Sequence, residues 1–193
     1  MSGSSSYVKV SDNNWMSQYA QEMTISLWAY ADDWSTETDG GRIFSCTESG
    51  GFNTEAGASG YLQFSHYVAT NSGRTTHGYQ YNNQGINLSE LTAGWHMFTF
   101  VYNLSGEKIY VDGELHSQKT ATSYGLKFNT NARLFLGCEA STANPSSPYF
   151  NGKMSDFKLF YTALSDDDIA KLYSTSSLID LHGNVFASSY VEE

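Results

Sequence analysis

The segment from Trp95 to Gly113, WHMFTFVYNLSGEKIYVDG, constrains the fold of this chain more than any other. Its first part, Trp95–Tyr102, is a continuous apolar and aromatic run of strand length, too short for a typical helix. Ser105-Gly106 predicts a tight turn, and Asp112-Gly113 predicts a hairpin turn, because both central positions of a type I′ turn need positive φ. The segment therefore predicts three consecutive antiparallel strands, Trp95–Tyr102, Glu107–Val111 and Glu114–Lys119.

The first of these strands is apolar on both faces, so it should lie at the centre of a sheet that is covered on each side. That arrangement is typical of a sandwich. A length of 193 residues suits one large all-β domain with a substantial core. Aromatic residues make up 15% of the chain and only two residues are proline, which favours a strand-rich domain over a helical one.

Further strands are predicted by short apolar or alternating runs at Tyr7–Val10, Met23–Ala31, Ile43–Cys46, Tyr61–Val68, Leu134–Gly137 and Lys153–Phe160. In the second of these, Ile25 and Leu27 face one side, and Trp28 and Tyr30 face the other. Between the strands, the composition predicts three long polar loops, Asp32–Asp39, Thr47–Gly60 and Asn71–Gln84.

One segment carries a helix signal. Ser165 stands three residues before Asp168, and apolar residues follow at Ile169 and Leu172, which predicts a capping box and a short amphipathic helix near 166–173. The three consecutive aspartates of this segment could form a metal cluster. The helix cap and the helix dipole explain them better.

The two cysteines, Cys46 and Cys138, stand near the ends of predicted strands. They would form a disulfide if those strands were neighbours. Two buried thiols that behave as small hydrophobic residues are the favoured interpretation, because two cysteines in a chain of this size are no disulfide framework.

The formal net charge is −10, which argues against nucleic acid and anionic membrane surfaces as partners, since both need basic patches. An uncharged polar ligand, such as a neutral glycan, or a cation is compatible with this charge. No apolar stretch approaches the roughly 20 residues of a membrane-spanning helix, so membrane insertion is not expected. The N-terminal MSGSSS shows no signal peptide, so export would need another route or an upstream start.

Four segments resemble laminin G-like domains of the concanavalin A-like lectin/glucanase superfamily: TISLWAYAD, GWHMFTFVYNLSGEKIYVDGEL, RLFLGCEAS and GKMSDFKLFYTALSDDDIAKLYS. They occur in the family's order and cover about Tyr7 to Ser174. The resemblance implies an all-β jelly-roll sandwich of two curved antiparallel sheets over residues 1–175, with one short helix near the C-terminus. The family's usual opening strand is missing here or supplied from elsewhere.

The tail, residues 176–193, reads as a separate hairpin around the turn His182-Gly183-Asn184. It is similar to segments that follow laminin G-like modules in bacteriophage and prophage structural proteins. In the alternative interpretation, the tail supplies the missing edge strand of the sandwich.

Catalysis is not expected. Hydrolases of the superfamily carry Glu-x-Asp-x-x-Glu on one strand, where alternation projects the acids from one face, and no such motif occurs here. The five histidines show no metal-ligand spacing, and His96 is interpreted as a structural strand residue.

The favoured function is therefore a non-catalytic, lectin-like adhesion module that recognises a cell-surface glycan, outside the cell or on a virion surface. The alternative is a structural or protein-interaction module of a virion or surface assembly, with homo-oligomers among its forms. Sugars are bound by aromatic faces and by polar side chains, which selects these candidates: Trp34, Asn53, Tyr67, Arg74, His77, Tyr79 and Tyr81. We expect Trp34, Arg74 and His77 to line a cleft. For Tyr79 and Tyr81, sugar contact and strand packing are equally open.

The resemblance also implies one structural calcium ion, because many relatives hold Ca²⁺ at a sheet rim. Asp156 occupies an acidic position of the family's penultimate-strand motif, although the preceding family acid is Ser155 here. Calcium takes six to eight oxygen ligands, so Asp156 would need several partners.

If a calcium ion is bound, EDTA should lower the melting temperature and added Ca²⁺ should restore it, because a ligand that binds only the folded state stabilises that state by mass action. Thermal unfolding with and without EDTA measures this. A melting temperature that changes with neither EDTA nor added Ca²⁺ would contradict calcium binding.

Overall fold

The computed structural model describes residues 6–10, 21–37, 42–47, 50–56, 60–70, 73–77, 85–120, 125–128, 131–141, 143–176, 178–179 and 185–187.

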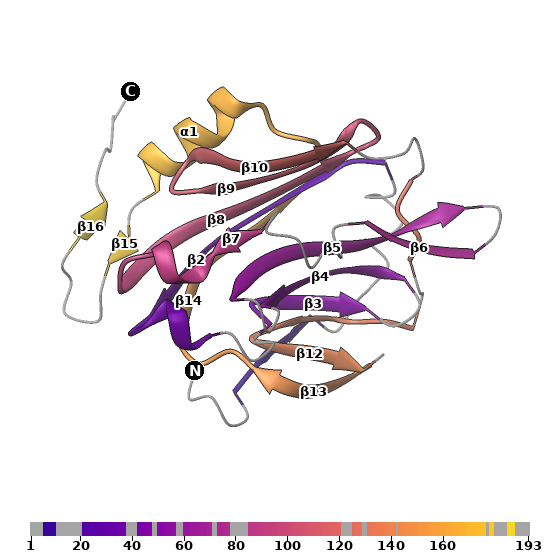
Figure 1. The fold of residues 1–193 in the computed structure, drawn as a ribbon, viewed down its shortest axis with the longest axis horizontal. Coiled ribbons are helices and arrows are strands. Elements are labelled where there is room, and N and C mark those ends of the chain that lie inside the picture. Colours follow the sequence, from indigo (N-terminus) through magenta and orange to yellow (C-terminus); the bar gives the residue numbers. More distant parts are fainter. Residues whose placement is uncertain are drawn as a thin grey trace.

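Two antiparallel sheets pack face to face (Figure 1). The seven-stranded sheet runs in the order β1 (Val8–Val10), β11 (Leu134–Leu136), β3 (Phe44–Thr47), β4 (Gly51–Ala56), β5 (Tyr61–Thr70) and β6 (Gly73–His77), with β7 (Ile86–Asn87) also paired to β5. The five-stranded sheet runs in the order β10 (Glu114–Thr120), β9 (Gly106–Val111), β8 (Gly94–Asn103), β2 (Met23–Ala31) and β14 (Lys153–Phe160). The predicted all-β jelly-roll sandwich is confirmed.

The remaining elements are short. They comprise the hairpins β12 (Cys138–Ser141) with β13 (Asn144–Tyr149) and β15 (Leu178–Ile179) with β16 (Val185–Ala187), the 3₁₀ turns η2 (Trp34–Thr36) and η3 (Leu88–Glu90), and the helix α1 (Asp166–Thr175). The helix starts at the predicted capping box: Asp168 N–H donates to Ser165 Oγ, and Ser165 N–H donates to the Asp168 carboxylate. The cap thus accounts for Asp168, one of the three consecutive aspartates.

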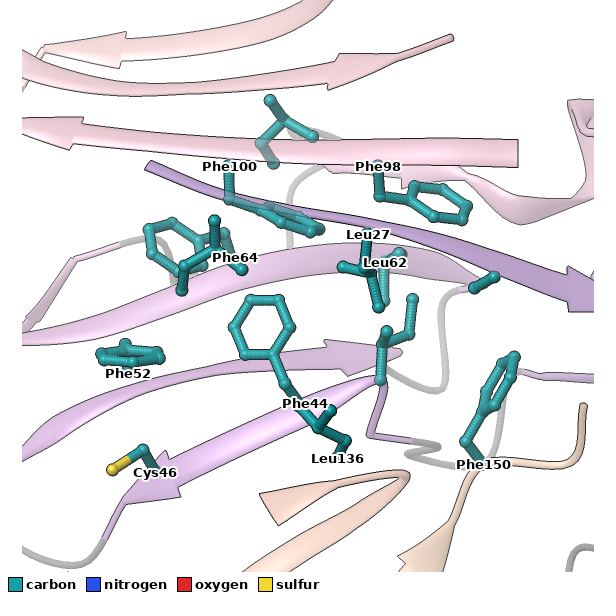
Figure 2. Close-up of a cluster of buried hydrophobic side chains, with 14 of the residues drawn as sticks. Leu27, Phe44, Cys46, Phe52, Leu62, Phe64, Phe98, Phe100, Leu136 and Phe150 are labelled. Atoms are coloured by element: carbon teal, nitrogen blue, oxygen red, sulfur yellow. The ribbon is translucent and has the colours of Figure 1, made fainter. Parts of the chain in front are cut away.

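The core fills the space between the sheets and is rich in aromatic rings (Figure 2). Phe44 of the seven-stranded sheet lies at the centre, with ring centroids 5.3 Å from Phe100, 5.9 Å from Phe52 and 6.3 Å from Phe64. Such edge-on contacts are the favoured geometry for aromatic pairs. Since Phe100 comes from the five-stranded sheet, these rings join the two layers.

The strand β8 is buried on both faces, as the sequence predicts. Its residues Phe98 and Phe100 point into the main core, while Met97 and Val101 point outward. The helix α1 lies across this outer face (Figure 1) and packs on it through Ile169, Leu172 and Tyr173. The cover on the second side of β8 is therefore a helix.

The predicted hairpin turn after β9 is confirmed, with φ of 51° at Asp112 and 82° at Gly113. A Cβ atom at Gly113 would lie 2.8 Å from Cβ of Tyr173 on α1, so the helix packs directly against the turn. Asp112 Oδ1 accepts from the Met97 N–H at 2.8 Å, and Asp112 Oδ2 lies 2.7 Å from Nδ1 of His96. His96 is thus a structural strand residue, as expected.

The hydrogen bond to Asp112 also changes the titration of His96. Desolvation by burial lowers the His96 pKa, but the hydrogen bonds to Asp112 and to the Thr92 carbonyl, with the attraction of the Asp112 charge, outweigh it. The net effect is a pKa above the usual histidine range.

A second histidine–carboxylate pair lies inside the sandwich. His66 of β5 and Glu107 of β9 are both buried, and Nδ1 of His66 lies 2.9 Å from Oε2 of Glu107. The pair therefore connects the two sheets. Burial, and then the nearby Glu107 carboxylate, raises the pKa of the neighbouring Tyr102 to about 12, so this phenol is neutral at physiological pH.

Two predicted loops contain strands. The segment Thr47–Gly60 includes β4, and Asn71–Gln84 includes β6. The glycines suggested a loop, but Phe52 and Thr54 of β4 are buried and the strand pairs with β3 and β5. Pairing and burial thus outweigh the low strand propensity of glycine.

The two cysteines are free and buried, which confirms the favoured interpretation of Cys46 and Cys138 as buried thiols. Burial raises the pKa of Cys46 to about 12 and that of Cys138 to about 11, so both thiols are protonated at neutral pH.

In the tail, β15 and β16 pair with each other as an antiparallel hairpin. Within the described residues they form a two-stranded sheet of their own, so they supply no edge strand to the sandwich. The edge next to β11 is occupied instead by β1.

Replacing Glu107 by Ala should lower the free energy of unfolding by about 2–5 kcal/mol, because the buried His66 ring loses its carboxylate partner. Urea unfolding measures the loss. Lys108→Ala is the matched control, since Lys108 is the next residue on β9 but pairs with Asp166 in solvent, where an ion pair contributes about 1 kcal/mol or less. Equal losses in the two variants would contradict a stabilising role for the buried pair.

The raised pKa of His96 makes stability depend on pH. The folded state holds the imidazole proton more tightly, so the His96–Asp112 pair stabilises fully below the unfolded pKa of about 6.5, and this contribution is lost as pH rises through the folded pKa. Wild type and Asp112→Asn should therefore differ most at acidic pH and converge at alkaline pH in urea unfolding. Asn tolerates the positive φ of the turn. A difference that is constant with pH would contradict this assignment.

Candidate functional site

Two of the predicted ligand-binding residues lie in the interior. Trp34 is 1% exposed, its rings pack against Phe98 and Phe150, and its indole N–H donates to the Gly94 carbonyl at 3.2 Å. Asn53 is 5% exposed on β4. The prediction that Trp34 lines a cleft is wrong, because its neighbours bury the indole face that would stack on a sugar, and Asn53 is likewise withdrawn from solvent.

Three other candidates lie on the last two strands of the seven-stranded sheet. Tyr67 of β5 pairs with Thr76, and Arg74 and His77 belong to β6. The structure thus brings these backbones together on neighbouring strands, and their ligand-binding role stays a prediction. Tyr79 and Tyr81 lie outside the described residues.

Asp156 lies on β14, at a bulge where its φ is 53°. Its carboxylate forms an ion pair with Lys158 two residues along the strand. Within the part of the chain that the structure describes, no three His, Cys, Asp or Glu side chains gather into a metal site. Lys158 thus occupies the Asp156 carboxylate in the structure, and calcium binding stays a prediction.

A groove of about 850 Å³ opens between the β8–β9 hairpin and the start of α1. Val101, Ala163 and Leu164 contribute apolar lining. Most of the lining is polar and includes Asn103, Lys108, Gln118, Lys119, Asp166 and Asp167. The register places Lys108 opposite Gln118 on adjacent strands, so their side chains share the outer face of the sheet.

The charges of the groove are arranged around Asp166. Its Oδ1 accepts from Lys108 Nζ at 2.7 Å and from the Tyr110 hydroxyl at 2.8 Å. The Lys108 hydrogen bond is the main cause that lowers the Asp166 pKa, and it likewise raises the Lys108 pKa. Burial, then the bond to Asp166, raises the pKa of Tyr110 to about 12. At neutral pH the groove therefore presents fixed donors and acceptors.

An aromatic row lies at the other end of the same sheet face. Tyr30 of β2 pairs with Trp95 of β8 and with Lys153 of β14. The Tyr30 and Trp95 rings lie 5.5 Å apart, Lys153 Nζ lies 4.6 Å from the Tyr30 ring centre, and the Tyr30 hydroxyl donates to Asp32 Oδ1 at 2.7 Å. Both rings are partly exposed.

No pattern in the sequence connects Lys108 and Gln118 with the aspartates of α1. The helix is separated from β9 by more than fifty residues, and only its packing on the outer sheet face brings the two together. The alternation of β9 and β10 was the available signal for an outward-facing polar pair.

No helix in the described part of the chain has both the length and the apolar character needed to cross a bilayer.

No curated protein matches this chain. Several solved structures share its fold. The binding domain of botulinum neurotoxin DC in complex with rat synaptotagmin II matches with a TM-score of 0.62 and 21% identity, over 95% of this chain and 45% of that one. A structure described by the dependence of botulinum neurotoxin type C cell entry on two ganglioside molecules matches at 0.61 and 20%, over 89% and 41%.

A third similar structure is the receptor-binding domain of botulinum neurotoxin mosaic serotype C/D, with a tetraethylene glycol molecule bound on its Hcn sub-domain. It matches with a TM-score of 0.59 and 18% identity, over 86% of this chain and 39% of that one. This chain thus spans less than half the length of each of these structures. At these identities the likeness shows the fold.

The family model for the concanavalin A-like lectin/glucanases superfamily, Laminin_G_3, matches residues 2–170. That range includes both sheets and the first half of α1. The chain therefore belongs to the laminin G-like family of the concanavalin A-like lectin/glucanase superfamily.

Proposed function

We propose that this chain is a non-catalytic, lectin-like module that binds a neutral glycan in the groove between the β8–β9 hairpin and α1. The polar groove of about 850 Å³ is the observation that carries the proposal. Its size is in the range of small-molecule sites, and its few apolar residues lie among many hydrogen-bonding ones.

The balance of charges favours a neutral ligand. Lys108 and Lys119 face Asp166 and Asp167 around the same groove, and the third acid of the lining, Glu107, is buried against His66, so neither sign dominates at the accessible surface. The aspartates would repel a phosphorylated or strongly acidic ligand. The hydroxyls of a neutral sugar, in contrast, can both donate to carboxylates and accept from ammonium and amide groups. The side chains of Lys108 and Asp166 are 38% and 59% exposed, so both are accessible to such a ligand.

The same chemistry disfavours Asp166 as the general acid of a glycosidase. A glycosidase needs two carboxyl groups, one of them protonated as the general acid. In this groove the Asp166 carboxyl has a lowered pKa and is occupied by Lys108 and Tyr110, so it stays ionised near neutral pH.

The proposed setting is a surface outside the cell or on a virion, where adhesion modules meet glycans. The similar structures support this setting, since their descriptions include a receptor-binding domain and interaction with gangliosides.

Protein interaction is the second candidate. One similar structure is a binding domain in complex with synaptotagmin. In this chain, Tyr7, which precedes the edge strand β1, is 42% exposed, and Val8 of β1 is 49% exposed. Homo-oligomers through the edges of the five-stranded sheet are disfavoured, because β10 and β14 both carry bulges and lysines, which hinder edge-to-edge pairing.

The test is a glycan array probed with wild type, Lys108→Ala and Gln118→Ala. Each groove variant should bind the recognised neutral glycan about tenfold more weakly, because a hydrogen-bonding group facing the sugar is lost. Stability should change by no more than about 0.5 kcal/mol for Gln118→Ala, as for ordinary surface substitutions.

Lys171→Ala is the matched control, since it removes an exposed lysine of α1 that does not line the groove. It should bind like wild type. Wild-type protein that binds no glycan on the array, or groove variants that bind like wild type, would contradict this proposal and leave protein interaction as the candidate to pursue.

A further inference from the structure

We propose that Trp95 and Tyr30 form a second sugar subsite, in which the apolar face of a pyranose ring stacks on the Trp95 indole. The platform comprises these two rings, tilted by 60° to each other, with the Lys153 ammonium over the Tyr30 ring and Asp32 beside the Tyr30 hydroxyl. This inference rests on the proposed glycan-binding function and extends it to a part of the sheet that the groove does not include.

The sheet register builds the platform. Lys153, Tyr30 and Trp95 stand side by side on β14, β2 and β8, and antiparallel partners directly opposite one another project from the same face. That face is the outer one, because the alternate residues Ala29 and Ala31 of β2 belong to the core. The strands hold the rings on a rigid base, which favours an ordered binding surface.

A packed aromatic cluster beside the platform fixes its position. The next row of the sheet holds Trp28, which is 4% exposed and stacks on Tyr173 of α1 with ring centroids 5.7 Å apart. Trp95 packs against this cluster with one part of its surface and keeps the rest in solvent. The helix therefore covers Trp28, in the row beside the platform, and leaves Tyr30 and Trp95 partly exposed.

The chemistry of the rim selects a neutral polyol. Aromatic faces attract the C–H surface of a sugar, while its hydroxyls need hydrogen-bond partners at the ring edge. Lys153 supplies a donor and Asp32 supplies an acceptor, and their charges cancel. A net anion or a net cation would be attracted by one of them and repelled by the other.

The groove and the platform lie at opposite ends of α1. Asp166 at the start of the helix binds Lys108 in the groove, whereas Tyr173 near its end packs beside the platform. Along β8, the distance from Val101 in the groove to Trp95 is roughly 20 Å at about 3.3 Å per residue. Only an oligosaccharide of several rings could reach both, so a single sugar would occupy one subsite at a time.

The experiment titrates the protein with cellohexaose, maltohexaose and chitohexaose and follows the indole N–H signal of Trp95 by NMR. Binding of a hexasaccharide should shift this signal. Calorimetry with Trp95→Ala should show binding weakened by about tenfold, while Trp95→Phe, which keeps an aromatic face, should stay within about threefold of wild type.

Tyr161→Ala is the matched control, since it removes a side chain that is 54% exposed and belongs to neither site, and it should bind like wild type. The NMR shift is measured on wild type, so it decides the question even if Trp95→Ala fails to fold.

The outcomes separate the two proposals. If hexasaccharide binds and weakens with Gln118→Ala but the Trp95 signal does not move, the platform is overturned and the groove stands. If the Trp95 signal moves and only the Trp95 variants weaken binding, the platform stands and the groove assignment fails. If wild type binds none of the three hexasaccharides, the sugar subsite is overturned.

Discussion

The two-sided burial of β8 is the constraint on which the rest of this structure depends. Its inward residues Phe98 and Phe100 complete the aromatic core with the facing sheet, and its outward residues Met97 and Val101 need a cover of their own. The second sheet can cover only one side of the strand, so the other side is closed by α1. The hydrophobic effect on both faces of one strand thus explains why an all-β chain includes a helix at this position.

The helix that closes the sheet also shapes the surface around it. At its start, the capped aspartates meet the side chains of β9 and β10 and enclose a polar groove. At its end, Tyr173 covers Trp28 and leaves Tyr30 and Trp95 partly open. Both candidate subsites therefore follow from the length and placement of α1 on the sheet. They involve the same structural element that protects the core from water.

Much of the fold could be predicted from local signals. Periodicity located β2, β8, β9 and β14 closely, and the capping residues located α1, because these signals depend on neighbours in sequence. The strand β4 escaped prediction, because Gly51 and the glycines that flank the strand favour a loop and only pairing with β3 and β5 outweighs them. The site was predicted poorly for the same reason: whether Trp34 faces solvent depends on Phe98 and Phe150, which are distant in sequence.

The contact between Gly113 and Tyr173 has a consequence for how such a module can diverge. The turn needs a residue with positive φ at this position, and the helix leaves no room there for a side chain. A side chain at this position would displace Tyr173 of α1. Surface residues such as Gln118 and Lys153 need neither a positive φ nor the absence of a side chain. Single exchanges at such surface positions can therefore change the chemistry of the candidate subsites without changing the turn on which the helix packs.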